Sequence, residues 1–332
     1  MATTRIALSL ALAAALPAGP ALALEVTPTG HLLSDYTVNL TETLSTGGAF
    51  AQTFGVSRAR IGLKAKEGPV MGMIQTDASN VGGTLDVHIR HAFADVDTGM
   101  GRLRGGQFST GWAIPVEQDW YPYRLQGVDF STREDLFPTE DRGVSWAGST
   151  GPLSLNVGVF NGEGYTGDET KVKSNFPKAY ETTVRFKAMD NAELGVHARF
   201  NDAPAGQQTQ GTALLGFKTD MGMLSLGAEG GVNMKQTGTA TSSLGIGGSV
   251  FAYAPNLIPV PMFETPIVRV DYAGDNFAGT KGNPNAHYRM QAGLLHNWAK
   301  GADTMISYEI DNELASGKQV AQIVSWRGGL KF

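Results

Sequence analysis

The chain closes on Ser325-Trp326-Arg327-Gly328-Gly329-Leu330-Lys331-Phe332, a stretch that ends on an aromatic side chain. Consecutive side chains of a β-strand point to opposite faces, so positions two apart share a face. Counted back from the C-terminus in steps of two, one face is apolar or small: Phe332, Leu330, Gly328, Trp326 and Val324. The other face is polar or small: Lys331, Gly329, Arg327 and Ser325. The stretch therefore predicts a strand that lies between an apolar medium and water.

This pattern is typical of the last strand of bacterial outer-membrane barrels, which have lipid outside and water inside. We therefore predict that Phe332 is the assembly signal of such a barrel and that the barrel-assembly machinery is a partner. A single strand is weak evidence, so the prediction depends on whether the rest of the chain agrees.

The N-terminus has the features of a secretory signal peptide. Arg5 supplies positive charge, residues 6–16 are an apolar run, and Ala21-Leu22-Ala23 is a small-x-small cleavage site. The apolar run is too short to span a bilayer. We predict that residues 1–23 are removed and that residues 24–332 form one outer-membrane barrel domain.

Composition agrees with an exported barrel. The mean hydropathy of −0.13 fits a wall in which lipid-facing and lumen-facing residues alternate. The chain has 43 glycines, about twice the average usage. It has no cysteine, which excludes a disulfide scaffold, thiolate metal sites and c-type haem attachment. Removing Arg5 with the signal peptide changes the formal charge from −5 to −6, which argues against nucleic acid as a partner.

Apolar–polar alternation, closed by turn residues, recurs along the whole mature chain. It predicts sixteen strands at 31–40, 53–66, 69–78, 85–96, 101–108, 142–150, 152–161, 179–188, 192–200, 211–219, 222–233, 244–255, 263–272, 286–298, 303–311 and 319–332. Fourteen or eighteen strands, and a soluble β-sandwich, remain open. The unbroken series and the alternation of short and long connectors favour an all-β fold, a 16-stranded antiparallel transmembrane β-barrel with both termini in the periplasm.

One connector, residues 109–141, is far longer than the others. Loops of this length in a compact fold are usually functional. It carries six large aromatic residues that would be costly to leave in water: Trp112, Trp120, Tyr121, Tyr123, Phe130 and Phe137. We therefore expect this third extracellular loop to fold back into the barrel and to narrow it.

Four motifs around this loop resemble the phosphate-selective porin O/P-like family. They are Gly106-Gln107-Phe108, Arg133-Glu134-Asp135-Leu136, Asp141-Arg142-Gly143-Val144 and Gly158-Val159-Phe160-Asn161-Gly162-Glu163-Gly164. The resemblance is firmest over residues 85–165. It implies a homotrimer of sixteen-stranded barrels in the outer membrane of a Gram-negative bacterium, each with the third loop as its constriction.

The charge of the loop departs from that family, in which arginine and lysine residues of the pore provide phosphate selectivity. Seven acids stand against two arginines. The acids are Glu117, Asp119, Asp129, Glu134, Asp135, Glu140 and Asp141, and the arginines are Arg124 and Arg133. Charges in a narrow passage set ion preference. We therefore expect a mildly cation-preferring pore, with an anion- or phosphate-selective porin as the alternative.

Alternation also places a set of basic residues on the lumenal faces of the early strands. The set is Arg58, Arg60, Lys64, Arg90, Arg102 and Arg104. A basic wall that faces an acidic loop would create an electric field across the pore. The alternative is structural, in which these side chains are solvated or pair with the acids.

Little in the sequence indicates catalysis or a cofactor. The six histidines lack metal-ligand spacing, because His88 and His91 are expected on opposite faces of one strand. No Ser-His-acid arrangement is evident, so we expect no enzyme activity. Asp271, Asp275 and Asn276 leave open a Ca²⁺ site in an outer loop.

The sequence thus predicts passive diffusion of ions and small hydrophilic solutes, with lipid and lipopolysaccharide around the barrel. Two other classes stay open. A barrel sheath for an electron-transfer partner would need a haem protein beside it, and a barrel enzyme would show turnover on lipids or peptides.

Overall fold

The computed structural model of the chain describes residues 24–41, 51–81, 84–112, 116–120, 129–162, 178–202, 208–237, 242–261, 263–275, 277, 286–314 and 319–332. The predicted signal peptide and Arg124 lie outside the described residues. No helix among the described residues has the length and hydrophobicity needed to cross a membrane.

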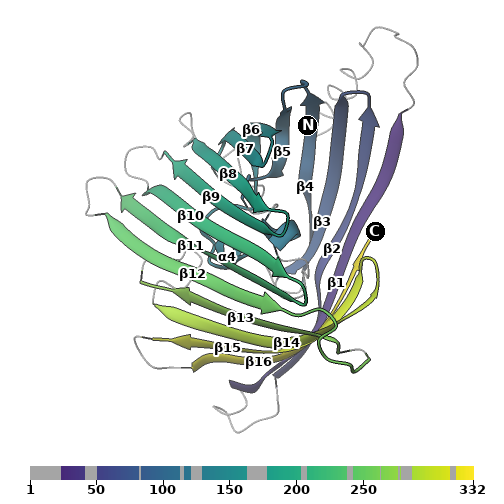
Figure 1. The fold of residues 1–332 in the computed structure, drawn as a ribbon, viewed down its shortest axis with the longest axis vertical. Helices are drawn as coiled ribbons and strands as arrows, with labels where there is room; N and C mark the ends of the chain where they lie inside the picture. Colours follow the sequence, from purple (N-terminus) through teal and green to yellow (C-terminus); the bar gives the residue numbers. More distant parts are fainter. Residues whose placement is uncertain are drawn as a thin grey trace.

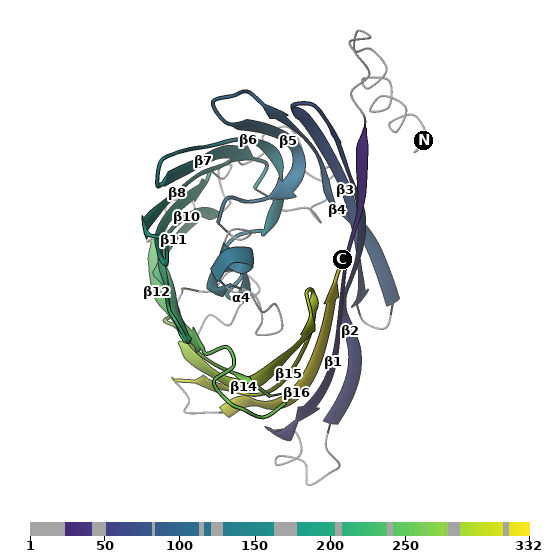
Figure 2. The same ribbon diagram turned by 45° about the vertical axis from the view of Figure 1, so that its right-hand side comes forward.

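The chain forms a closed antiparallel barrel of sixteen strands in which each strand pairs with its neighbours in sequence and β1 pairs with β16 (Figures 1 and 2). The strands are β1 (Glu25–Asn39), β2 (Ala51–Glu67), β3 (Val70–Val81), β4 (Thr84–Asp97), β5 (Arg102–Ser109), β6 (Glu140–Thr150), β7 (Leu153–Phe160), β8 (Ala179–Met189), β9 (Ala192–Asn201), β10 (Gln208–Met221), β11 (Leu224–Thr237), β12 (Ser243–Tyr253), β13 (Thr265–Ala273), β14 (His287–Ala299), β15 (Ala302–Glu313) and β16 (Gln319–Lys331). The predicted fold class and strand number are confirmed.

The two rims of the barrel have connectors of different length. At one rim, six connectors span two to four residues, such as 68–69 and 151–152. Gly68 and Gly151 have φ of 54° and 53° there, a left-handed backbone that favours glycine in a tight turn. Short turns mark the periplasmic rim of outer-membrane barrels, so the opposite rim, which carries connector 110–139 and most of the other long connectors, is the extracellular one.

The two faces of the wall follow the alternation. On β13, Val268, Val270 and Tyr272 point outward and are exposed, whereas Arg269 and Asp271 point inward and are buried. The outer surface of the barrel is therefore an apolar belt. The buried apolar core lies in the lumen, against the inner face of the wall.

Strand β1 starts at Glu25 rather than at residue 31, the largest boundary difference from the sequence-based strands. Its first residues pair only with β2, from Glu25 opposite Lys66 to Thr29 opposite Gly62. Pro28 lies in this stretch, where one edge of the strand has no neighbour among the described residues and a missing N–H is tolerated.

The expectation that His88 and His91 point to opposite faces is wrong. Gln75 pairs with His91 and Thr76 pairs with Ile89, so Arg90 is the extra residue of a β-bulge. The bulge reverses the alternation, and both histidines face the lumen. Gln107 supports it by donating its side-chain amide to the carbonyl oxygens of Ile89 and Arg90.

Candidate pore constriction

We call the connector between β5 and β6, residues 110–139, the inner loop, and its described parts, 110–112, 116–120 and 129–139, lie inside the barrel (Figure 2). Its described parts contain a π-helical turn, η1 (Val116–Trp120), and a single helical turn, α4 (Phe130–Arg133). Polar contacts of the inner loop reach β8, β9, β10, β11, β13, β14 and β15. The inner loop is therefore attached to that half of the wall.

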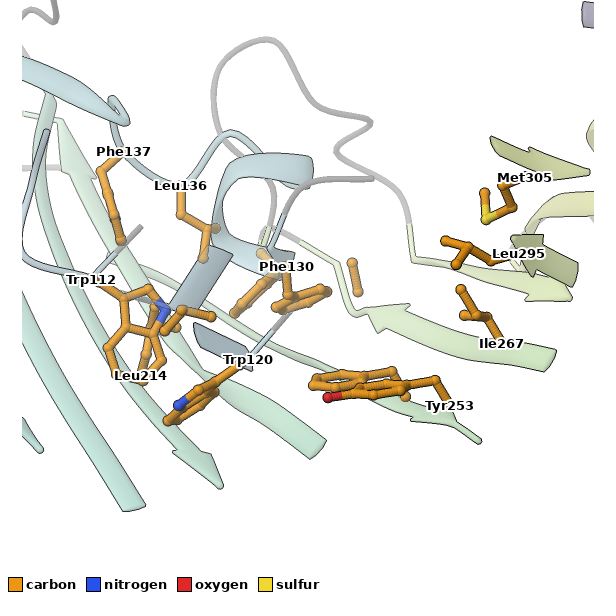
Figure 3. Close-up of a cluster of buried hydrophobic side chains, with 14 of the residues drawn as sticks. Trp112, Trp120, Phe130, Leu136, Phe137, Leu214, Tyr253, Ile267, Leu295 and Met305 are labelled. Carbon is orange, nitrogen blue, oxygen red and sulfur yellow. The ribbon is translucent and has the colours of Figure 1, made fainter. Parts of the chain in front are cut away.

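Trp112 and Trp120 of the inner loop, labelled in Figure 3, pack onto glycines of the wall. Trp112 and Trp120 are fully buried and meet edge to face, with ring centroids 5.6 Å apart. A Cβ at Gly195 on β9 would lie 3.1 Å from both ring systems, and a Cβ at Gly216 on β10 would overlap the Trp120 ring. The glycines leave the space that the tryptophans fill, and tight packing of this kind holds a loop in one place.

The remainder of the buried cluster joins inner-loop residues to apolar residues of the wall. The loop contributes Val116, Phe130, Leu136 and Phe137, and Phe277 comes from the connector after β13. The wall strands contribute Leu33, Leu214, Phe251, Tyr253, Ile267, Ala273, Leu295 and Met305 (Figure 3). The sequence-based site did not include these wall residues. The signal was present, since each is an apolar residue at a position where alternation expects a polar one.

Glu229 on β11 connects the segment of the inner loop that follows β5 with the segment that leads to β6. Its carboxylate accepts a hydrogen bond from the Trp112 indole N–H at 3.3 Å and another from the backbone N–H of Phe130. One buried carboxylate therefore holds both segments of the inner loop.

The acids of the inner loop and of the first residues of β6 are mostly neutralised by arginines of the wall. Glu134 is buried and lies 2.8 Å from Arg289 and 3.2 Å from His287 on β14. Asp141, at the start of β6, lies 3.0 Å from Arg199 on β9. Removing one partner of a buried pair costs about 3–5 kcal/mol, so these contacts fix the position of the loop.

The other acids of the predicted constriction differ in exposure and in their contacts. Glu140 is buried against Arg90. Asp129 caps α4 by accepting a hydrogen bond from the Thr132 backbone N–H at 3.1 Å. Asp135 is half-buried, and its φ is 52°. Asp119 pairs with Arg185 on β8, yet 54% of its side chain is exposed.

Two predicted loop residues remain to be placed. Glu117 lies in η1, but its side chain is outside the described atoms. Arg133 bridges Asp271 on β13 and Glu309 on β15, each at 2.7 Å. Arg133 therefore serves as a third attachment of the loop to the wall.

The predicted basic wall faces the lumen, and most of its members pair with acids of the same wall. Arg60 lies 2.7 Å and Arg90 3.3 Å from Asp77. Arg104 makes a bidentate contact with Asp95 at 2.6 and 2.7 Å.

The more accessible members of the basic wall are Arg102, Arg58 and Lys64. Arg102 lies 3.7 Å from Asp95 with 55% of its side chain exposed. Arg58 is half-buried and Lys64 is exposed.

Two cavities open beside the inner loop in the periplasmic half of the lumen. One, of about 600 Å³, includes Arg102 in its lining, and the other, of about 420 Å³, includes Asp119. Their linings share Ser154 and Arg185. Together they carry five acids and five bases: Asp97, Asp119, Asp190, Glu193, Asp220, Arg102, Arg104, Arg185, Lys187 and Lys218. The water-accessible lining there is close to neutral.

The residues considered for Ca²⁺ are engaged in other contacts. Asp271 is buried between Arg133 and Arg269, each at 2.7 Å. Asp275 accepts a hydrogen bond from the Ala286 backbone N–H at 2.7 Å, and Asn276 lies outside the described residues. Within the described parts of the chain, no group of histidines and acids has a metal-binding arrangement.

No protein-family model matches the chain, and no curated protein sequence matches it. Several solved structures share its fold. A loop-deletion mutant of OmpT, an outer membrane protein of Vibrio cholerae, is 12% identical with a TM-score of 0.68 over 93% of this chain and 100% of that one. An anion-selective porin from Comamonas acidovorans is 14% identical, with a TM-score of 0.65 over 93% and 100% of the two chains. OmpF of Salmonella typhi is 14% identical, with a TM-score of 0.65 over 92% and 97%. The chain therefore has the fold of Gram-negative outer-membrane porins.

Proposed function

We propose that this chain is an outer-membrane porin that forms a water-filled channel for passive diffusion of ions and small hydrophilic solutes. The observation that carries the proposal is the inner loop, which is packed inside a closed barrel against β8–β15 and lies beside cavities of about 600 and 420 Å³. A loop fixed in the lumen leaves a polar passage of limited width, and pore width and lining select solutes.

We further propose that the channel has a mild cation preference. The mature chain carries a formal charge of −6, the total of −5 less Arg5. The cavity linings nevertheless hold five acids and five bases. Glu134 of the inner loop, and Glu140 and Asp141 at the start of β6, are buried in ion pairs, so the loop alone does not set the preference. A weak preference that salt screens is the expected behaviour.

Two exposed side chains provide a matched test of this selectivity. Asp119 and Arg102 are about equally exposed, at 54% and 55%, and each lines one of the cavities. In a planar bilayer under a low-salt gradient, Asp119→Asn is expected to move the reversal potential towards anions and Arg102→Gln towards cations. Both shifts should fade near 1 M salt, where the screening length is about 3 Å. Unchanged potentials in both variants would mean that ions bypass these side chains.

Resemblance to the phosphate-selective porin O/P-like family remains part of the proposal. One motif lies within the inner loop, from the last residue of α4 to Leu136. The others lie at the end of β5, at the start of β6 and, for their described residues 158–162, at the end of β7. Arg133, one of the loop's two arginines, is already bound by Asp271 and Glu309. The loop therefore presents no free arrangement of donors among its described residues to replace the hydration of phosphate.

We expect phosphate to bind weakly. Millimolar inorganic phosphate should leave the chloride conductance of reconstituted channels nearly unchanged, with sulfate as the control anion. Saturable block at micromolar phosphate would contradict this prediction and would restore the selectivity for which the family is named.

We propose that three barrels associate. The outward positions of β3 include Gly72 and Thr76, small or weakly apolar residues that suit contact with protein better than with lipid. Native mass spectrometry of the detergent-solubilised protein is expected to give the mass of a trimer. A stable monomer that conducts ions would show that the association is unnecessary.

A further inference from the structure

The periplasmic rim has one connector unlike its neighbours. Residues 254–264 join β12 to β13, whereas the other connectors of this rim span two to four residues (Figure 1). From 254 to 263 the sequence contains no charged residue and includes three prolines. Leu257, Val260 and Phe263 are 51%, 49% and 39% exposed. A folded segment that presents this much apolar surface is a contact site.

Three backbone hydrogen bonds form within the connector. Leu257 donates to Ala254 across a turn whose central residues are Pro255 and Asn256, and Asn256 has a φ of 57°. Phe263 donates to Val260 in a second turn.

The two turns are joined by the backbone N–H of Ile258, which donates to Glu264 at 3.2 Å. The prolines at 255, 259 and 261 have no N–H to leave unpaired. Each N–H that is paired or missing lowers the cost of placing irregular backbone beside an apolar medium, where each unpaired group costs several kcal/mol.

Contacts with β14 place the end of the connector on the outer side of the wall. Leu295 faces the lumen, so the next side chain along the strand, His296, points outward. Glu264 lies 2.6 Å from His296, and the His296 ring meets Trp298 edge to face. Trp298 is 55% exposed and donates its indole N–H to Thr304. Tryptophans at this level are typical of the membrane interface.

We propose that the described part of this connector, residues 254–261 and 263–264, is a membrane anchor whose apolar side chains Leu257, Val260 and Phe263 enter the phospholipid leaflet at the periplasmic rim. The anchor is continuous with the apolar belt of the barrel, because Val268 points outward on the strand that the connector leads into. The pair of Glu264 and His296 holds it against the wall. This inference goes beyond channel activity and concerns how the barrel sits in its membrane.

The absence of cysteine makes the test direct, since a single introduced cysteine carries the only label. Leu257→Cys, Val260→Cys and Phe263→Cys are each labelled with a nitroxide and reconstituted, as full-length protein, into vesicles of phosphatidylethanolamine and phosphatidylglycerol. Collisions with oxygen, which concentrates in lipid, are compared with collisions with a water-soluble nickel chelate. Val268→Cys serves as the lipid control. Met223→Cys, on the exposed tight turn 222–223, serves as the water control.

The anchor predicts an oxygen-to-nickel collision ratio severalfold above that of the Met223 site at all three connector positions, close to that of the Val268 site. Ratios equal to that of Met223 would overturn the anchor. Connector positions that are accessible to the nickel chelate in the vesicles, and become protected only when a periplasmic extract is added, would also overturn it, in favour of a protein partner. A Val268 site that is accessible to the nickel chelate would overturn the membrane placement of the barrel itself. Failure of the anchor and failure of the barrel placement are therefore distinguishable.

Discussion

Gly216→Val is expected to raise the single-channel conductance and the size limit for solutes, because it detaches the inner loop. Any side chain at Gly216 overlaps the ring of Trp120, which packs against Trp112. Both tryptophans are fully buried in the interface between the loop and the wall. Loss of one large buried aromatic contact costs about 3–5 kcal/mol, so the loop should leave its position while the hydrogen-bonded barrel persists.

The matched control is Ala213→Val on the same strand. Ala213 points outward and is exposed, so the added methyl groups meet lipid and not the loop. Conductance in a planar bilayer, together with the shift in gel mobility between folded and heated protein, separates loop movement from loss of the barrel. Equal conductance of folded Gly216→Val and wild-type channels would show that the loop does not limit the passage.

Deletion of Phe332 is expected to reduce insertion of the barrel sharply and to leave aggregate in the periplasm. Phe332 and Gly30 exchange backbone hydrogen bonds at 2.8 and 3.1 Å, which extend the seam between β1 and β16. The ring lies over Gly30, where a Cβ would overlap it, and 64% of the residue is exposed on the outer side. The deletion removes two hydrogen bonds, about 0.5–1.5 kcal/mol each, and the terminal aromatic group.

Gly30→Val separates the two roles of Phe332, which are its packing at the seam between β1 and β16 and its role as assembly signal. It displaces the ring but keeps the C-terminal sequence for the assembly machinery to bind. If Phe332 is an assembly signal, the deletion should fail to insert while Gly30→Val inserts with a weakened seam. Normal insertion of the truncated chain, measured as protein in purified outer membranes, would remove the support for that role.

Sequence alternation was sufficient to predict all sixteen strands, because the rule that one face meets lipid and the other meets water is local. Most predicted boundaries lie within three residues of the observed ones. The exceptions are β1, whose first residues pair on one side only, and the end of β11, which extends to Thr237. The bulge at Arg90 escaped prediction because its support, the side chain of Gln107, comes from the neighbouring strand.

The aromatic residues of the inner loop were sufficient to predict that it folds into the barrel. The effect of its charges on the passage was not predictable from the sequence. The sequence shows Glu134 and Arg289 as 155 residues apart, and only the closed barrel brings them to 2.8 Å. Counting loop acids against loop arginines therefore overstates the charge that the passage presents. The apolar positions on the lumenal face, such as Leu214 and Ile267, were the missed local signal for where the loop docks.

Single-channel recording of the purified wild-type protein in a planar bilayer tests the central claim most directly. The account predicts discrete conductance steps without any ligand, grouped in threes, with a current that is proportional to voltage. Insertion of correctly folded protein that leaves the bilayer non-conducting would contradict it, because the proposed function requires a water-filled passage beside the inner loop.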